Sequence, residues 1–171
     1  MTLSMYQASI PALVRAMHNL AHLLDVGAAH LEAQGTSVDA MLELRLVDGM
    51  LPLSRQVQIA TDMAKNGAAR LVGETPVAIA DDETTHAQLQ ARIARVIEIC
   101  EGFPADRFNG SESRVIHLPR TAAGELTFDG STYLTVFVLP NLYFHVTMTY
   151  ALLRQAGVPL GKLDYTGRPK A

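Results

Sequence analysis

The residue with the clearest chemical potential in this sequence is His145, one of six histidines. On a helical wheel it shares a face with Leu142, Thr149 and Leu152, so its imidazole is expected to point into the protein core. A buried imidazole needs a hydrogen-bond partner, and it can also ligate a metal ion or move a proton. Two interpretations stay open. A structural core histidine is the commoner case, and a histidine that serves a ligand or a reaction is the alternative.

Gln56 is the polar residue that we expect nearest to His145. It borders the apolar face of another predicted helix, close to Ala60 and Gly67. Gln56 either lines a pocket or bonds a histidine across the protein, or it only marks the edge of the core, and the two interpretations carry equal weight. The candidate ligand-binding residues are His145, Gln56, Thr149 and Asn141, and the catalytic residues stay unassigned.

Other potentially reactive side chains are expected to be inert. His18 and His22 are four residues apart, a spacing that lets two helical histidines hold one metal ion. They fall beside Arg15 and Asp25, away from the apolar stripe of their helix, and no HExxH pattern is present, so we expect surface histidines. The single cysteine, Cys100, has no cationic neighbour on its predicted face and should be an unreactive buried thiol. These patterns predict no metal site and no cofactor.

Four long helical patterns and one hairpin must position these residues. Helices are predicted over residues 9–34, 49–72, 85–102 and 131–156, with the last one broken or kinked near Pro140. A short helical piece is predicted at 37–44, and strand-like runs at 114–118 and 125–128 predict a hairpin. The predicted N-terminal caps are Ser9 (or Ser4, which would require a kink), Asp48, Thr85, and Ser131 or Thr132.

These elements predict an all-α four-helix bundle with short connections and a small β-hairpin inserted before the last helix. One domain is expected over residues 1–171, with 158–171 as a C-terminal tail. Hydrophobic residues make up 49% of the chain and the formal net charge is -3 without a basic run, so nucleic-acid binding is not expected. No apolar stretch is expected to approach the roughly 20 residues of a membrane span, and Met1 opens no signal peptide. We therefore expect a cytoplasmic protein without a membrane partner.

Four blocks, in order along the chain, resemble one bacterial and fungal family of unknown function. They are SMYQASIP at 4–11, LSRQVQIA at 53–60, LPNLYFHV at 139–146 and GVPLGK at 157–162. That family is placed in the DinB/YfiT-like superfamily of metalloenzymes. The resemblance implies a four-helix bundle, often dimeric, and better-understood members resemble metal-dependent hydrolases or thiol-dependent S-transferases.

The same resemblance implies a three-histidine metal site, with one histidine on the second helix and an HxxxH pair on the last. His145 matches the first histidine of that pair, but the position of the second is occupied by Thr149. The second helix contains no histidine, and Gln56 is its nearest polar candidate. One of three ligands is present, so the resemblance supports the fold more than a metalloenzyme.

The sequence therefore predicts a DinB-like bundle with a degenerate metal site that binds a small molecule, or performs metal-free chemistry, around His145 and Gln56. One alternative is a metal-dependent hydrolase or thiol-dependent S-transferase with an unconventional ligand set. A second alternative is a non-catalytic, dimeric helical association module. A homodimer is expected.

Overall fold

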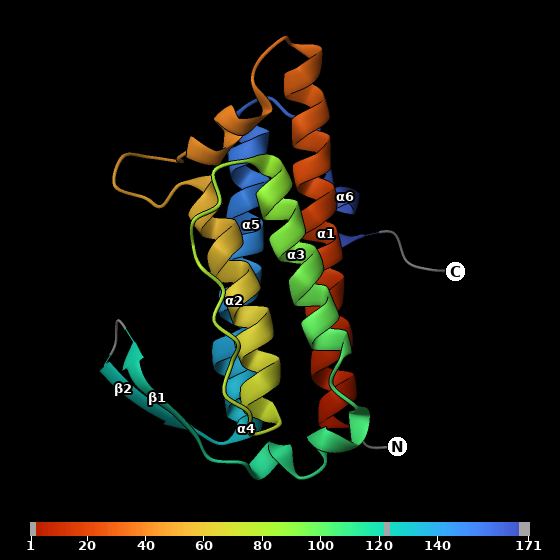
Figure 1. Cartoon of the computed structure of the whole chain (residues 1–171), viewed down its shortest axis with the longest axis vertical. Helices are drawn as coiled ribbons and strands as arrows, with labels where there is room; N and C mark the ends of the chain where they lie inside the picture. Colours follow the sequence, from red (N-terminus) through yellow and green to blue (C-terminus); the bar gives the residue numbers. More distant parts are fainter. Residues whose placement is uncertain (1–2, 122–123, 168–171) are drawn as a thin grey trace.

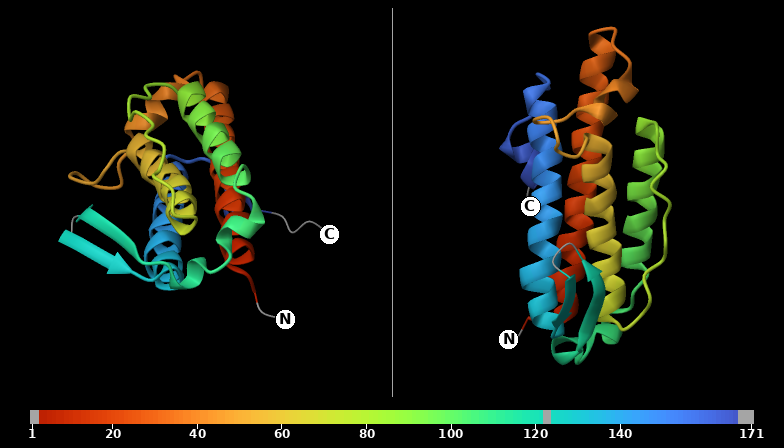
Figure 2. Two further views of the ribbon diagram at one scale, coloured as in Figure 1. Left: turned by 60° about the horizontal axis from the view of Figure 1, so that its bottom comes forward. Right: turned by 90° about the vertical axis from the view of Figure 1, so that its left-hand side faces the viewer.

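The computed structural model describes residues 3–121 and 124–167, and four long helices form its body. They are α1 (Met5–Ala33), α2 (Leu53–Leu71), α3 (His86–Glu101) and α5 (Leu139–Gln155). Helices α1 and α5 run in one direction and α2 and α3 in the other (Figure 1). Helix α2 packs against α3 and α5, and α1 also packs against both of them, so each helix has two neighbours around the bundle (Figure 2). The predicted four-helix bundle is confirmed.

Small side chains on α2 let the neighbouring helices approach closely. Ala60, Ala64 and Ala68 are fully buried on its inner face, as the spacing of these residues predicts. Gly67 lies against the residues that precede α5, and a Cβ atom at this position would be 2.7 Å from the Cγ1 atom of Val138. Any larger residue at position 67 would push α2 and the last helical segment apart.

Helix α1 begins four residues earlier than the predicted cap. Ser4 is the N-cap: its Oγ accepts a hydrogen bond from the Gln7 backbone N–H at 3.2 Å, and Gln7 Oε1 accepts one from the Ser4 N–H at 3.0 Å. This reciprocal pair satisfies two N–H groups that a helix start leaves free. Of the two predicted caps, Ser9 was therefore wrong, and the alternative, Ser4, is confirmed. Ser9 is buried, and its hydroxyl donates to the Met5 carbonyl at 2.6 Å.

Helix α2 begins later than predicted, at Leu53, with Pro52 in extended conformation at the N-cap. A residue that precedes proline is sterically disfavoured from helical geometry, so a helix could not run from Gly49 through Leu51 into Pro52. Gly49 has a φ of 87°, which places it in a turn. The prediction of Asp48 as a cap was therefore wrong. A 3-10 helix at Val38–Glu43 occupies the predicted short helical piece.

The connection from α2 to α3 is long and returns along the bundle, which corrects the expectation of short connections only. Helices α2 and α3 run in the same direction, so residues 73–85 must cross from one end of the bundle to the other (Figure 1). Helix α3 then starts at the predicted capping box, in which Thr85 Oγ1 accepts from the Gln88 N–H at 3.2 Å.

The predicted hairpin is confirmed between α3 and the last helical segment. Strands β1 (Ile116–Thr121) and β2 (Gly124–Phe128) pair antiparallel, with Ile116 opposite Phe128 and Leu118 opposite Leu126. Ile116 and Leu118 are buried, whereas His117 between them is exposed, as strand alternation predicts. Strand β1 starts two residues later than the predicted run at 114–118 and continues to Thr121, and β2 starts at Gly124, so residues expected between the strands belong to them. Residues 122 and 123 lie outside the described residues.

The last helical segment is capped by Asp129, not by the predicted Ser131 or Thr132. Asp129 accepts hydrogen bonds from the Thr132 N–H and the Ser131 hydroxyl, and these bonds lower the pKa of its carboxyl group to about 2. The short α4 (Gly130–Thr132) continues into a π-helical turn at Tyr133–Val138 and then into α5. The predicted break near Pro140 takes this form, because a wider turn accommodates a residue that has no N–H and crowds the preceding carbonyls.

The segment Gly130–Gln155 corrects the expectation that no apolar stretch approaches a membrane span. By length and composition it is long and apolar enough to cross a bilayer, with a mean hydropathy of 1.4 in its best window. The core helix of a soluble protein can meet the same criterion. Here the segment packs on α1 and α2, although only 33% of that window is buried. Part of its apolar surface therefore stays exposed.

The region predicted as a C-terminal tail contains a further helix, α6 (Lys162–Thr166), which packs on α1. Arg15 donates hydrogen bonds to the Thr166 carbonyl through Nε and Nη2, at 3.1 and 2.7 Å. Asn19 Nδ2 donates to the Tyr165 carbonyl at 2.9 Å. These contacts span more than 140 residues of sequence, so local patterns could not reveal them. Residues 168–171 of the predicted tail lie outside the described residues.

Candidate functional site

His145 lies on the face of α5 that packs on α2, and its exposed fraction is only 9%. Leu142, Thr149 and Leu152, which share this face, are also buried. The predicted inward orientation is confirmed. Burial also sets the charge of the ring: it lowers the pKa of His145, so the imidazole is neutral at neutral pH.

A hydrogen bond across the bundle joins His145 to Gln56, and it fixes the tautomer of the imidazole. His145 Nδ1 lies 2.7 Å from Gln56 Oε1. The Gln56 amide is oriented by a second bond, in which its Nε2 donates to the Leu51 carbonyl at 3.1 Å. Because a carbonyl only accepts, the oxygen of the amide must face the histidine, and Nδ1 must carry the proton. Of the two interpretations of Gln56, the structure therefore supports the one in which it bonds a histidine across the protein.

The other ring nitrogen, Nε2, consequently carries the lone pair. It forms no hydrogen bond within the described part of the chain. Among the described residues, Ser111 Oγ is the one side-chain polar atom that is fully buried without a hydrogen-bond partner. Because His145 Nε2 also has no partner and is not such an atom, it retains some exposure to solvent. The ring of Phe144 stands edge-on to the imidazole, with centroids 5.1 Å apart. A neutral, oriented Nε2 at the edge of the core can accept a hydrogen bond or a proton from a bound molecule.

Thr149 and Asn141, the other candidate residues, direct their polar groups to the helix backbone. The Thr149 hydroxyl donates to the His145 carbonyl at 3.1 Å, and Thr149 is fully buried. Asn141 Nδ2 donates to the Phe137 carbonyl at 2.7 Å. Neither side chain bonds the imidazole. The structure therefore brings Gln56 to His145 but leaves Thr149 and Asn141 without a polar contact to the ring.

The residues around His145 do not fit the three-ligand metal site that the family resemblance implies. Within residues 3–121 and 124–167, no group of three or more His, Cys, Asp or Glu side chains is placed to hold a metal ion. Gln56 Oε1 already accepts from Nδ1–H, and the Thr149 hydroxyl is bonded to the backbone. Only Nε2 remains as a donor atom, whereas a catalytic zinc site takes three protein ligands. We therefore derive no step of the function through a metal.

The remaining histidines and the cysteine behave largely as expected. His18 and His22 are exposed on α1, and His22 Nε2 lies 2.9 Å from Asp164 Oδ1 on α6. His86 is half-buried, and its Nε2 is 3.4 Å from an Asp25 oxygen. Cys100 is fully buried, and burial raises its pKa to about 12, with a smaller contribution from the nearby Glu101. A thiol with this pKa is not a nucleophile at neutral pH.

A buried arginine on α3 is the strongest polar feature that the sequence analysis missed. The Arg92 side chain is 1% exposed and forms ion pairs at 2.9 Å with Asp62, Asp81 and Glu83. It also donates to Thr61 Oγ1 at 2.7 Å and to a backbone carbonyl of the 73–85 connection. The arginine therefore binds α2, α3 and the crossover connection together, which is a structural role.

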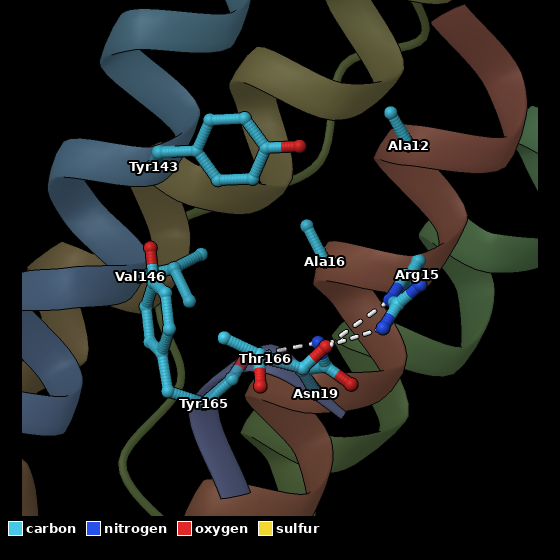
Figure 3. Close-up of a pocket in the computed structure, with 8 residues that line it drawn as sticks. All are labelled: Ala12, Arg15, Ala16, Asn19, Tyr143, Val146, Tyr165 and Thr166. Carbon is cyan, nitrogen blue, oxygen red and sulfur yellow. Dashed lines mark hydrogen bonds between the residues drawn. The ribbon is translucent and has the colours of Figure 1, made fainter. Parts of the chain in front are cut away.

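A cavity of about 180 Å³ lies between α1, α5 and α6 (Figure 3). Two of its lining residues, Tyr143 and Val146, are close to His145 in sequence, but they face α1. Local sequence patterns could not reveal this cavity, because one of its walls is α6, which lies in the region predicted as a tail. It is lined by Ala12, Arg15, Ala16, Asn19, Tyr143, Val146, Tyr165 and Thr166.

Comparison with known proteins identifies a family and a solved structure of high similarity. Residues 5–166 match the model of a domain of unknown function, DUF1993. The chain is 38% identical to a DinB family member protein from Shewanella denitrificans, whose crystal structure superimposes with a TM-score of 0.89 over 97% of this chain and 93% of that one. No curated protein matches the sequence.

Proposed function

The chain belongs to the DUF1993 family of DinB-like bundles, and from the geometry at His145 we propose that it binds a small molecule at the seam between α2 and α5. The ligand is one that carries an N–H, O–H or S–H group, which donates a hydrogen bond to His145 Nε2. Gln56 is the positioning residue of this site, since it holds the ring in the tautomer that leaves Nε2 unprotonated.

The observation that carries the proposal is the pair of hydrogen bonds made by Gln56. A histidine with a purely structural role needs a hydrogen-bond acceptor for its ring N–H, and any nearby acceptor can fill that role. Here the Gln56 amide also donates to the Leu51 carbonyl, which fixes the direction of its oxygen, so the imidazole is held in one tautomer and one orientation. Neutral histidines that act through one nitrogen are commonly oriented in this way through the other.

Nuclear magnetic resonance of the histidine nitrogens tests the proposal. In the free protein, long-range ¹H–¹⁵N correlation should show His145 with Nδ1 protonated and Nε2 unprotonated. A library of small alcohols, thiols and carboxamides is then screened for compounds that shift the Nε2 resonance. His145→Asn is the informative variant, because its amide N–H can replace Nδ1–H toward Gln56 while Nε2 is removed. His117→Asn, at an exposed strand position, is the matched control.

We expect compounds that shift Nε2 in the wild type to lose affinity for His145→Asn and to keep it for His117→Asn. If the ring is protonated on Nε2, or if His145→Asn binds the same compounds equally well, the proposed function is wrong.

Association is a second candidate function, favoured by apolar side chains on the outer face of the last helical segment. Val136 and Phe144 are 63% and 54% exposed. Isolated exposed apolar residues are common, but a row of them along one helix is typical of an interface. We propose that a second copy of the chain covers this row in a homodimer.

A further inference from the structure

The cavity between α1, α5 and α6 combines apolar walls with a cation and a hydroxyl that have no ion pair and no hydrogen bond, respectively, to a side chain among residues 3–121 and 124–167. None of its eight described lining residues is acidic. The cavity is distinct from the seam at His145, because Tyr143 and His145 lie on different faces of α5. A ligand in this cavity would therefore bind independently of the function proposed for His145.

Arg15 supplies the cation. Its Nε and Nη2 groups donate to the main-chain carbonyls of Thr166 and Gly167, and Nη1 has no hydrogen bond within the described residues. Arg15 also forms no ion pair there, whereas Arg55, Arg92 and Arg107 all pair with carboxylates. Carbonyl partners orient the guanidinium group but do not neutralise its charge, so this end of the cavity favours an anion.

Tyr143 supplies the hydroxyl. Figure 3 shows its ring reaching from α5 toward α1, with the hydroxyl aimed at the wall where Ala12 and Ala16 present only methyl groups. The hydroxyl forms no hydrogen bond within the described part of the chain. Burial and the nearby Tyr165 raise the pKa of Tyr143, while Arg15 acts in the opposite direction, so the phenol keeps its proton at neutral pH and is a donor.

The walls set the size and polarity of the rest of the ligand. Ala12, Ala16 and Val146 offer apolar surface, and the cavity volume is about 180 Å³. A protein cavity of about 150 Å³ holds benzene, so this one has room for a hydrocarbon group of about that size. A phosphate or sulfate ion would leave these apolar walls uncovered and would find one guanidinium group instead of several donors.

We propose that this cavity binds a small monocarboxylic acid, with the carboxylate between Arg15 Nη1 and the Tyr143 hydroxyl and the hydrocarbon group on Ala12, Ala16 and Val146. Benzoate and butyrate are the probes, and the neutral isosteres benzamide and butyramide are their controls. Titrations of the full chain are followed by ¹H–¹³C shifts of the Ala12 and Ala16 methyl groups.

Two variants test the two halves of the site. Tyr143→Phe removes only the hydroxyl, and we expect benzoate to bind roughly tenfold more weakly or worse, since a hydrogen bond to a charged group is lost. Ala12→Leu fills the cavity and should abolish binding. The matched control is Tyr150→Phe, because Tyr150 lies on the same helix, packs on Tyr165 and does not line the cavity.

The expected result is that benzoate or butyrate shifts both methyl groups, the amides do not, and Tyr150→Phe binds as the wild type does. The inference is overturned if neither acid binds at millimolar concentration, or if the amides bind as tightly as the acids. It is equally overturned if inorganic phosphate displaces benzoate competitively at equal concentration, or if both site variants keep wild-type affinity.

Discussion

Replacement of Gln56 by leucine tests the geometry on which the site at His145 depends. Leucine has a similar size but removes the acceptor of Nδ1–H and the donor to the Leu51 carbonyl. Leu51 is 44% exposed, so water can replace the second bond. His145 is 9% exposed, so its N–H is left largely without a partner. An unsatisfied buried donor costs about 1–3 kcal/mol, and we expect Gln56→Leu to lower the free energy of unfolding by that amount.

A double-mutant cycle separates this bond from other effects of the substitution. His145→Leu leaves Gln56 Oε1 unpaired and should cost a similar amount if the histidine is structural. The double variant removes both polar partners, so its loss should be smaller than the sum of the single losses by about 1–3 kcal/mol. Urea unfolding followed by circular dichroism gives the four values, and equal m-values are required for the comparison. Gln155→Leu, at an exposed position of α5, is the control and should stay within about 0.5 kcal/mol of the wild type.

Strict additivity in the cycle, or a Gln56→Leu variant as stable as the wild type, would refute the assignment of the bond and of the tautomer. The stability of His145→Leu also bears on the function of this histidine. If His145→Leu is neutral or stabilising while compounds no longer bind, His145 is retained for the ligand at a cost in stability, as functional residues often are.

Four further outcomes are expected. Burial lowers the pKa of His145 in the folded state, so the unfolded chain binds more protons at acidic pH. The free energy of unfolding should therefore fall as the pH drops below about 6.5, by at most about 1.4 kcal/mol per pH unit. His145→Asn should show a smaller dependence of this free energy on pH, and an unchanged dependence would contradict the prediction. Arg92→Met should cost about 3–5 kcal/mol in urea unfolding because the buried Glu83 carboxylate loses its ion pair, whereas the partly exposed Asp62 and Asp81 keep Lys65 and Arg55. A loss below about 1 kcal/mol would contradict this. Elemental analysis of untagged protein should find no stoichiometric zinc or nickel. One equivalent of either metal that is lost in His145→Ala would contradict this prediction. Sedimentation at micromolar concentration should give a dimer that Phe144→Lys dissociates, and a monomeric wild type would argue otherwise.

Local patterns predicted those parts of the fold whose causes are local. The capping box at Thr85 depends on residues three positions apart, and the inward face of His145 follows from helical periodicity alone. Gln56 was among the candidates because it borders an apolar face. The error at the start of α1 is also local in origin: Ser4 and Ser9 both precede apolar residues, and only Ser4 has a glutamine three residues on.

The elements that the sequence did not predict are those defined by long-range contacts. Gln58 and Lys65 are polar side chains of α2, yet both are buried. Gln58 donates to Glu83 of the 73–85 connection, and Lys65 pairs with Asp62, which also pairs with Arg92. Nothing in the spacing of charged residues on α2 distinguishes a face covered by a crossover connection from one covered by water. The same limit applies to α6, whose position is set by Arg15, Asn19 and their carbonyl partners 146 to 151 residues away.

The contrast between locally and long-range determined features bears on how a function should be assigned to residues of α5. Residues two positions apart on a helix project about 200° apart, so Tyr143 and His145 face different seams of the same bundle. His145 was a candidate from the sequence alone because an imidazole can bind a ligand or move a proton and because helical periodicity predicts that it points inward. The tyrosine becomes significant only when α6 closes the cavity next to it. Since the two side chains share a helix but not a pocket, Tyr143→Phe and His145→Asn should affect different ligands, and an activity assigned to this protein through its histidine alone would leave the second seam untested.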